Sequence, residues 1–573
     1  MSSSVLMSAL LPRRSFHRST PLGRVWRTAR SGLLPLIAAI LASGPAVGQN
    51  GAPDVATEVD RLFAWTSEST PGCAVAVDKD GERVVDRAYG MADMERGVPL
   101  TSETVFDVGS VTKQFVAAVV LSLVEDGRLA LDDDVRQYVP ELPDPGHTIT
   151  IDHLLTHTSG VRDWTGLQMM SRGEEDALTL VLRQRGLNFV PGDAWSYSNS
   201  GYVLLKEIVA RVTGEPFSEA ARQRLFEPLG MTSTVYAEDP QGGAYDRLAV
   251  AYQGEGEDWE SGVLKGNKRG GGGALLSTAS DLLIWNEALA EGRPSPFVAR
   301  TLQEPARLNG GRAIGYGRGL FLDTIGGARA VWHSGSAGAY KALAARFPEH
   351  GLSLAIVCNA GDRQPPMRFA GPIRSLFLPD AEPDVPADAE AGVEVESKAG
   401  LYVSQPDGDL MRLVVQRGRL RVEGGPLLVA LGADRFRNVE SEMDFQSGDR
   451  VEVHFLSPDA FEIVASDGGV TRYARAEPFA PTAAERAVFG GCYVNDELNA
   501  VLVVAAEADG LTVRLNDSRA FPSTPVVRDT YQLGRMTMHF LRDDAGAVTA
   551  MEYSNPVLRH VTFQRTPDTA GCL

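Results

Sequence analysis

The chain has 573 residues, of which 43% are hydrophobic and 23% are charged, and its formal net charge is −19 at pH 7. At about 100–200 residues per domain this length predicts several domains, and the ordinary apolar content excludes both a wholly disordered chain and a polytopic membrane protein. The surplus of acidic groups repels phosphate backbones and therefore argues against nucleic-acid binding.

The first 48 residues have the pattern of an export signal. They contain six arginines and no acidic residue, and a short apolar stretch over 33–42 leads to the small residues Ala46-Val47-Gly48. This order predicts a cleaved secretory signal over 1–48, because the apolar stretch is shorter than the roughly 17–25 residues of a transmembrane helix. We expect a periplasmic or secreted protein with no integral membrane segment after signal removal; the alternative is a disordered basic tail.

Residues 54–378 mix helical and strand patterns, and an apolar stretch at 109–124 predicts a buried helix. Ser110 and Lys113 lie three residues apart at its start and hence on one face. A desolvated lysine at the positive end of a helix loses its preference for the charged form, so it can accept the proton of a serine hydroxyl. The alternative is a serine cap followed by a lysine that reaches solvent, which suits a buried helix poorly.

Two later segments carry groups suited to the lining of a cleft. In the loop before a helix predicted over 202–212, Tyr197 and Asn199 are two residues apart and can aim a phenol and an amide in one direction. In the segment 331–340, Gly335 lets a strand backbone approach a bound substrate closely. Taken alone, each segment is also an ordinary turn or strand end.

Together and in this order, the three segments resemble the penicillin-recognising serine hydrolases, in the branch of class C β-lactamases, D-alanyl-D-alanine carboxypeptidases and D-aminopeptidases. The segments 151–160 and 272–282 also resemble stretches of that family. The family's S-x-x-K, Y-x-N and [KH]-[TS]-G motifs match Ser110 to Lys113, Tyr197 to Asn199 and His333 to Gly335. The resemblance implies an α+β catalytic domain over 54–378, with an antiparallel sheet flanked by helices and an all-helical region.

The resemblance also implies roles for these residues. Ser110 would attack a carbonyl carbon, Lys113 would accept its proton, and Tyr197 would pass a proton to the leaving group; the division between Lys113 and Tyr197 stays open. Asn199 would hold the substrate's acyl amide. The backbone amides of Ser110 and Ser336 would stabilise the oxyanion, beside the close strand at Gly335.

His333 stands where many β-lactamases of this family have lysine. Because the ordinary pKa of histidine is near about 6.5, it holds a substrate carboxylate less well, and it would instead polarise Tyr197 or contact the substrate. This difference favours peptides or amides of D-amino acids, or small esters, as substrates. The alternatives are a β-lactamase or D-Ala-D-Ala carboxypeptidase that binds penicillin, and a catalytically silent binding protein.

The sequence predicts no metal and no cofactor. His153 and His157 lie four residues apart, but no glutamate follows the first of them as it does in H-E-x-x-H. Gly270 to Gly273 lacks the Lys-Ser/Thr of a phosphate-binding loop. The expected partner is therefore a small peptide, amide or ester substrate, and the oligomeric state stays open.

After an acidic, proline-rich linker at 379–396, the pattern changes to short alternating strands. Gly400-Leu401-Tyr402-Val403 recurs as Gly491-Cys492-Tyr493-Val494, so the units 397–478 and 483–567 form a repeat. We expect two small antiparallel barrels, similar to the lipocalin-like barrels of D-aminopeptidases; the alternative is one β-sandwich. As in those relatives, the barrels would lie near the mouth of the active site and restrict substrate size.

Four cysteines are present in the chain, and no two of them form a C-x-x-C pair. Cys492 and Cys572 flank the last predicted barrel, so they can pair in an exported protein, or else the cysteines are buried free thiols.

Overall fold

In this computed structural model the described residues are 54–567, except for 174, 238–244, 256–257, 262–274, 379–392, 406–407, 424, 440–450, 466–468, 478, 535 and 556. The signal predicted over 1–48, the glycines 270–273, most of the linker predicted over 379–396, and Cys572 lie outside the described residues. No helix among the described residues is long and apolar enough to cross a membrane.

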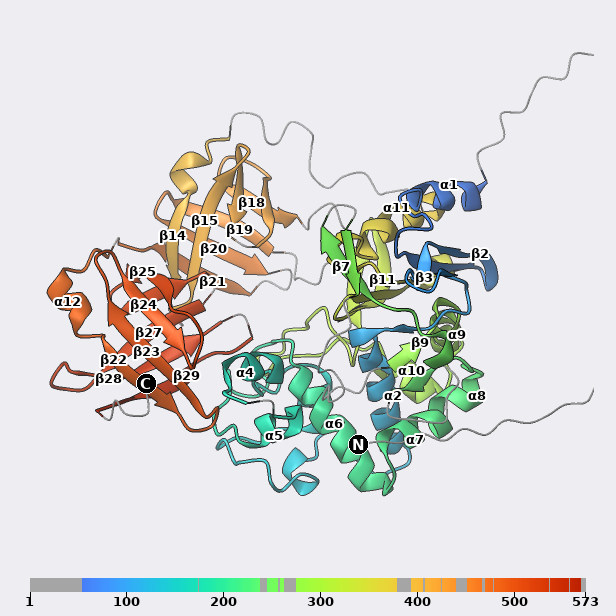
Figure 1. The fold of residues 1–573 in the computed structure, drawn as a ribbon, viewed down its shortest axis with the longest axis horizontal. Helices are drawn as coiled ribbons and strands as arrows, with labels where there is room; N and C mark the ends of the chain where they lie inside the picture. Colours follow the sequence, from blue (N-terminus) through green and yellow to red (C-terminus); the bar gives the residue numbers. More distant parts are fainter. Residues whose placement is uncertain are drawn as a thin grey trace, which may run out of the picture. The chain divides into compact units, whose positions relative to one another are not determined.

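An antiparallel sheet of six strands organises the N-terminal half of the chain (Figure 1). Its order is β10 (Phe321–Ile325), β11 (Ala328–Ala337), β12 (Tyr340–Phe347), β13 (Leu352–Cys358), β1 (Cys73–Lys79) and β2 (Glu82–Tyr89). Side chains of β1 alternate between two apolar cores, with Ala74 and Ala76 in one and Val75 and Val77 in the other. Because both faces of the sheet are covered, β1 is apolar at successive positions instead of alternating with polar residues.

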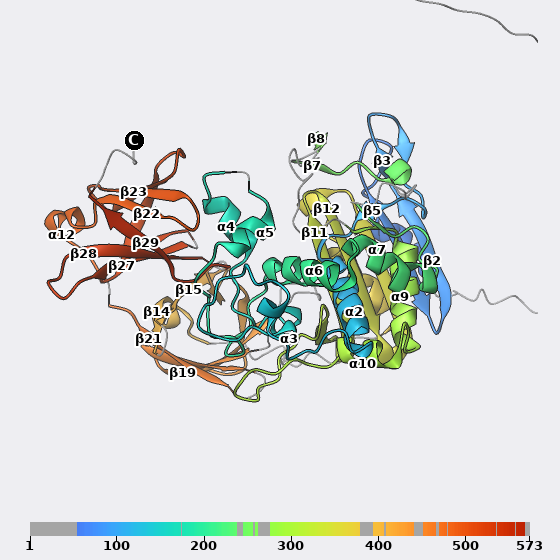
Figure 2. The same ribbon diagram turned by 90° about the horizontal axis from the view of Figure 1, so that it is seen from below.

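Helices cover both faces of this sheet. One core contains residues of α2 (Thr112–Glu125), α9 (Ala279–Ala290) and α10 (Pro296–Leu302), and the other contains residues of α1 (Val55–Leu62) and α11 (Met367–Phe377). Every residue of α2 from Thr112 to Leu121 is buried, as expected for a helix that is apolar on all sides. In Figure 2, α2 lies beside α6 (Asn199–Thr213) of the helical region.

The helical region and the short strands complete this half of the chain. The helices are α3 (Ile151–Leu155), α4 (Trp164–Met170), α5 (Ala177–Leu182), α7 (Phe217–Ala221) and α8 (Glu227–Leu229). The short strands are β3 (Met91–Asp93), β4 (Val98–Pro99), β5 (Phe106–Asp107), β6 (Val235–Tyr236), β7 (Tyr252–Glu255), β8 (Asp258–Ser261) and β9 (Leu275–Ser277).

Helix α6 begins three residues earlier than the sequence pattern predicted. It starts at Asn199 instead of Tyr202, because the backbone N–H of Asn199 finds an acceptor in the carboxylate of Asp163, 2.5 Å away. It ends at Thr213, one residue after the predicted end, and Gly214 follows in the left-handed conformation at φ 79°.

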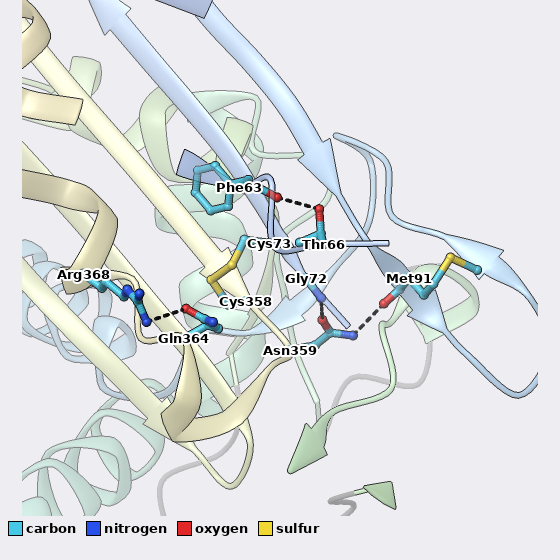
Figure 3. Close-up of a disulfide and its surroundings, with 9 residues drawn as sticks. All are labelled: Phe63, Thr66, Gly72, Cys73, Met91, Cys358, Asn359, Gln364 and Arg368. Carbon is cyan, nitrogen blue, oxygen red and sulfur yellow. Dashed lines mark hydrogen bonds between the residues drawn. A yellow bond between two sulfur atoms is a disulfide. The ribbon is translucent and has the colours of Figure 1, made fainter. Parts of the chain in front are cut away.

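A disulfide that the sequence did not reveal joins two central strands (Figure 3). Cys73 of β1 and Cys358 of β13 lie directly opposite each other in the antiparallel register, with 4.0 Å between their Cα atoms. Cys492 is also disulfide-bonded, so these three cysteines are not the free thiols that the sequence left open. The predicted pairing of Cys492 with Cys572 falls on a residue outside the described part.

The C-terminal half forms two closed antiparallel barrels of eight strands, which confirms the predicted fold class and excludes a single sandwich. Barrel 1 consists of β14 (Gly400–Ser404), β15 (Leu410–Gln416), β16 (Arg419–Val422), β17 (Leu427–Ala430), β18 (Arg435–Val439), β19 (Val451–Ser457), β20 (Ala460–Ala465) and β21 (Val470–Arg475). Barrel 2 consists of β22 (Gly491–Asn495), β23 (Ala500–Ala506), β24 (Leu511–Leu515), β25 (Phe521–Val527), β26 (Thr530–Leu533), β27 (Met536–Arg542), β28 (Val548–Ser554) and β29 (Val561–Thr566), and α12 (Ala483–Ala487) precedes it.

The repeated tyrosine has the same place in both barrels. Tyr402 and Tyr493 are fully buried, and each hydroxyl donates to the carbonyl oxygen four residues earlier, at 2.9 and 2.7 Å. An arginine of the last strand, Arg475 or Arg565, lies over each ring. The repeat in the sequence therefore encodes a repeated packing unit.

Barrel 2 contacts the helical region. Leu167 of α4 and Leu180 of α5 belong to the same apolar cluster as the interior of barrel 2. The side chain of Asn188 donates to the carbonyl oxygen of Val557 at 3.0 Å and accepts from the backbone N–H of Arg559 at 2.8 Å. A restriction of substrate size by the barrels remains a prediction.

Candidate active site

A serine and a lysine meet at the start of α2. Ser110 lies in the single turn Gly109–Val111 that leads into the helix, and the Nζ atom of Lys113 is 3.1 Å from its Oγ atom. The same Nζ donates to Oδ1 of Asn199, at 2.8 Å. Residues three apart on a helix lie on one face, and this spacing places the Ser110 hydroxyl within reach of the Lys113 amine.

Burial prepares this amine to accept a proton. Lys113 is 5% exposed, and its Nζ lies 4.6 Å from the centre of the Tyr197 ring and 5.4 Å from that of Tyr202. Desolvation lowers the pKa of Lys113 to about 7, against the opposing effect of the Asp163 carboxylate. Near pH 7 a substantial fraction of Lys113 is therefore neutral and able to accept the proton of Ser110.

Asp163 holds Asn199 in place, and the sequence analysis did not identify it. Its Oδ2 atom accepts from both the backbone N–H and the side-chain Nδ2 of Asn199, at 2.5 and 2.9 Å. Its Oδ1 atom caps α4 by accepting from the backbone N–H of Thr165 at 2.8 Å. The amide is thereby oriented with Oδ1 toward Lys113, and both of its polar ends are engaged inside the protein.

Tyr197 presents a protonated phenol to the same place. Burial raises the pKa of its hydroxyl, while the nearby Ser110 hydroxyl acts in the opposite direction without the geometry of a full hydrogen bond. Among the described residues nothing hydrogen-bonds to this hydroxyl. The phenol therefore stays protonated near pH 7 and is available as a proton donor, whereas the neutral form of the Lys113 amine is available as a proton acceptor.

His333 lies in a buried chain of hydrogen bonds. Its Nε2 atom is 3.3 Å from the Tyr316 hydroxyl, which is 3.2 Å from Nε2 of His157. Its Nδ1 atom is 2.6 Å from the carbonyl oxygen of Ser334, and Nδ1 of His157 accepts from the backbone N–H of Ser198 at 3.1 Å. These partners define the tautomers: His333 carries its proton on Nδ1 and accepts from Tyr316, whereas His157 donates through Nε2.

This setting makes His333 a neutral group. It is 1% exposed, and burial, followed by the neighbouring Lys113, lowers its pKa to about 3. Its ring centre is 6.1 Å from that of Tyr197. His333 thus packs near the Tyr197 ring, and both of its ring nitrogens are already hydrogen-bonded, to Tyr316 and to Ser334. Tyr316 carried no signal in the sequence, and His157 stood out there only as one of two histidines that match no metal-binding motif.

The third segment brings its backbone against the nucleophile turn. A Cβ atom on Gly335 would lie 1.8 Å from the carbonyl oxygen of Val108 and 3.1 Å from the backbone nitrogen of Ser110. A Cβ atom on Gly109, whose φ is +52°, would lie 2.5 Å from the backbone nitrogen of Ser336. Only glycine permits these approaches, which bring the backbone of Ser336 close to that of Ser110.

The structure thus brings the predicted residues to one place. Four of the predicted side chains lie close together: those of Ser110, Lys113, Tyr197 and Asn199. The strand backbone at 335–336 lies beside them, and the His333 ring lies near the Tyr197 ring. In the described ranges no group of three or more His, Cys, Asp or Glu side chains could hold a metal ion.

The chain is similar to several known proteins. The family model described as "Beta-lactamase" matches residues 56–376. The D-aminopeptidase of Cereibacter sphaeroides (strain KD131 / KCTC 12085) is 27% identical over 521 residues, which cover 86% of this chain and 96% of that protein. Penicillin-binding protein 4* of Bacillus subtilis (strain 168) is 29% identical over 421 residues, covering 67% of this chain and 91% of that protein. The solved structure of D-amino acid amidase from Ochrobactrum anthropi SV3 complexed with L-phenylalanine is 26% identical and covers 57% of this chain and 94% of its own, with a TM-score of 0.47.

The fold and the serine–lysine pair together define a serine hydrolase. The chain belongs to the beta-lactamase family, as the resemblance of its three motifs implied.

Proposed function

We propose that this enzyme hydrolyses peptides or amides of D-amino acids, and small esters, through an acyl-enzyme on Ser110. The observation that carries the proposal is the buried Lys113, with a pKa of about 7, at 3.1 Å from the Ser110 hydroxyl. The D-amino-acid preference is supported by the D-aminopeptidase that matches 86% of the chain.

The reaction proceeds in two halves. Lys113 takes the proton of Ser110 as Oγ attacks the carbonyl carbon, and the amides of Ser110 and Ser336 stabilise the oxyanion. Tyr197 donates its proton to the leaving nitrogen and regains one from Lys113, so that the amine departs and the ester on Ser110 remains. Water then attacks the ester and gives one proton to Lys113. Lys113 passes this proton to Oγ of Ser110 as the ester bond breaks and the acid is released.

Two residues act on this reaction through others. Asn199 keeps the Lys113 amine pointed at Ser110, since its Oδ1 accepts from Nζ at 2.8 Å. His333, neutral and packed behind the Tyr197 ring, helps to exclude water from the phenol. The raised pKa of Tyr197 keeps its phenol protonated, so that Tyr197 holds the proton for the leaving group while the neutral Lys113 amine serves as the base.

Export is part of the proposal. The Cys73–Cys358 disulfide lies in the core of the sheet, and such bonds persist in oxidising compartments outside the cytosol. Together with the signal pattern of 1–48, this supports a periplasmic or secreted enzyme.

The test is the mass of the intact protein after incubation with a fluorophosphonate, a penicillin and a D-alanine ester, with product release followed in parallel. We expect one adduct on Ser110, turnover of the D-alanine ester, and a trapped penicillin. Ser110→Ala should abolish labelling and turnover. Ser122→Ala, farther along the same helix, should retain both.

Other outcomes would redirect the assignment. Rapid release of the penicillin would identify a β-lactamase instead. Full activity of Ser110→Ala would refute the nucleophile, and no adduct with any probe would favour the silent binding protein.

A further inference from the structure

A tyrosine outside all three motifs lies at the centre of the buried hydrogen bonds around the site. Tyr316 is 1% exposed, and its hydroxyl oxygen is 3.2 Å from Nε2 of His157 and 3.3 Å from Nε2 of His333. The rings of Trp195 and Phe321 pack around the tyrosine ring, with their centres 5.9 and 4.8 Å from its own. The hydroxyl group is therefore held between two histidines that come from distant parts of the chain.

The hydrogen bonds through Tyr316 run in a single direction. At one end the backbone N–H of Ser198 donates to Nδ1 of His157, so the hydrogen of the neutral His157 ring is on Nε2, beside Tyr316. At the other end Nδ1 of His333 donates to the carbonyl oxygen of Ser334, so Nε2 of His333 accepts from the tyrosine. The hydroxyl group thus accepts from one histidine and donates to the other.

Both histidines are neutral in this setting. Burial, followed by the neighbouring Lys113 and His333, lowers the pKa of His157 well below its ordinary value. Burial is also the main cause that lowers the pKa of His333 to about 3. A neutral imidazole has one donor and one acceptor nitrogen, so removal of the Tyr316 hydroxyl takes the partner from a buried donor on His157 and from a buried acceptor on His333.

The same two histidines lie beside Tyr197, the proposed acid of the reaction. The centre of the Tyr197 ring is 4.3 Å from that of His157 and 6.1 Å from that of His333. His157 also holds the backbone of the Tyr197 loop, through the N–H of Ser198. His333 belongs to β11, the strand that packs against the turn of the nucleophile. A bridge between the two histidines therefore ties the loop of the acid to the strand beside the nucleophile.

We propose that Tyr316 is a positioning residue for the acid step: its hydroxyl group joins His157 to His333 and thereby holds the Tyr197 phenol where it can reach the leaving group. This inference rests on the proposed function, since it concerns the acid of that reaction. Tyr316 is buried and acts through the two histidines. Its effect should therefore appear in the step that needs the proton of Tyr197, and much less in the attack by Ser110.

The test compares two substrates with the same acyl group in Tyr316→Phe. The nitrogen of D-alanine amide must be protonated as it leaves, whereas D-alanine p-nitrophenyl ester releases a phenolate that needs no proton. The readout is the ratio of kcat/KM for the amide to kcat/KM for the ester, after subtraction of spontaneous hydrolysis. A positioned acid contributes about 10²–10⁴ in rate, so we expect this ratio to fall about ten- to a hundredfold while kcat/KM for the ester stays within about threefold.

Tyr402→Phe in barrel 1 is the matched control. It removes another fully buried hydroxyl group, which is hydrogen-bonded to the carbonyl oxygens of Lys398 and Pro458, and the ratio should stay at the unmodified value. An unchanged ratio in Tyr316→Phe, or equal losses on both substrates, overturns the positioning role while the hydrolase function stands. Failure of the unmodified enzyme to hydrolyse the amide overturns the proposed function, and this inference with it.

A second measurement does not depend on the folding of Tyr316→Phe. Nuclear magnetic resonance of the unmodified protein with ¹⁵N-labelled histidine distinguishes the two neutral tautomers, and His157→Gln and His333→Gln identify the two signals. We expect the hydrogen of His157 on Nε2 and that of His333 on Nδ1 from pH 6 to 9. A protonated ring in this range, or the opposite tautomer at either histidine, is incompatible with the bridge through Tyr316 and overturns the proposal.

Discussion

Replacing Gly335 by alanine should move apart the two backbone amides that we propose as oxyanion donors, those of Ser110 and Ser336. The added Cβ atom would lie 1.8 Å from the carbonyl oxygen of Val108, whereas real Cβ atoms essentially never come closer than 3.0 Å to a neighbour. Strand β11 and the turn at Ser110 must therefore move apart by at least about 1.2 Å, the difference between these two distances. Both sides of the clash are backbone, so no flexible side chain can absorb the shift.

The expected loss is kinetic more than structural. A misplacement of about 1 Å can cost about 10²-fold in rate, and the loss of one oxyanion donor about 10²–10³-fold. We therefore expect kcat/KM of Gly335→Ala to fall by about 10²–10³. Overpacking of this kind costs about 1–3 kcal/mol of stability, so the variant should still fold.

The assay is hydrolysis of a D-alanine ester together with thermal unfolding followed by circular dichroism. Gly310→Ala is the control, because a Cβ atom there meets nothing within 4 Å and its φ lies outside the left-handed region. Its kcat/KM should stay within about twofold of the unmodified enzyme. A folded Gly335→Ala protein with kcat/KM within threefold of the unmodified value would refute the close approach on which this reasoning depends.

Two further predictions concern the base. Because burial lowers the pKa of Lys113 to about 7 and only its neutral form accepts a proton, log kcat/KM should rise with a slope of one up to about pH 7 and then level off; a flat profile from pH 5 to 9 would contradict this role. Asp163→Ala removes the acceptor of both Asn199 donors and the carboxylate that raises the Lys113 pKa. In this variant kcat/KM should fall about ten- to a hundredfold and the midpoint of the pH profile should move to lower pH, so a midpoint that stays or rises would count against the proposed electrostatics.

The local parts of this protein were predictable from its sequence. The apolar stretch after Ser110 predicts a buried helix, because a helix that is apolar on all sides must have all of its sides covered. The same stretch places Lys113 one turn from Ser110, since spacing along a helix is set by its geometry. The recurrence around Tyr402 and Tyr493 indicates two similar units, because each barrel closes its own strands and buries the same ring.

Only the tertiary structure decided which distant residues meet. Asp163 looks like an ordinary helix cap, and its second hydrogen-bonding edge is taken by Asn199, 36 residues later. Cys73 and Cys358 are 285 residues apart and become neighbours because the first and last strands of the hydrolase half pair.

The same is true of the polar groups around the site. Tyr316 shows no pattern along the chain, and its hydroxyl group lies between His157 and His333 only because separate segments pack together. The neutral state of His333 arises from its burial against Tyr316, another contact between separate segments. Periodicity records which side of an element is buried, whereas the partner of a buried polar group depends on which surfaces pack together, and that is settled only when the whole chain folds.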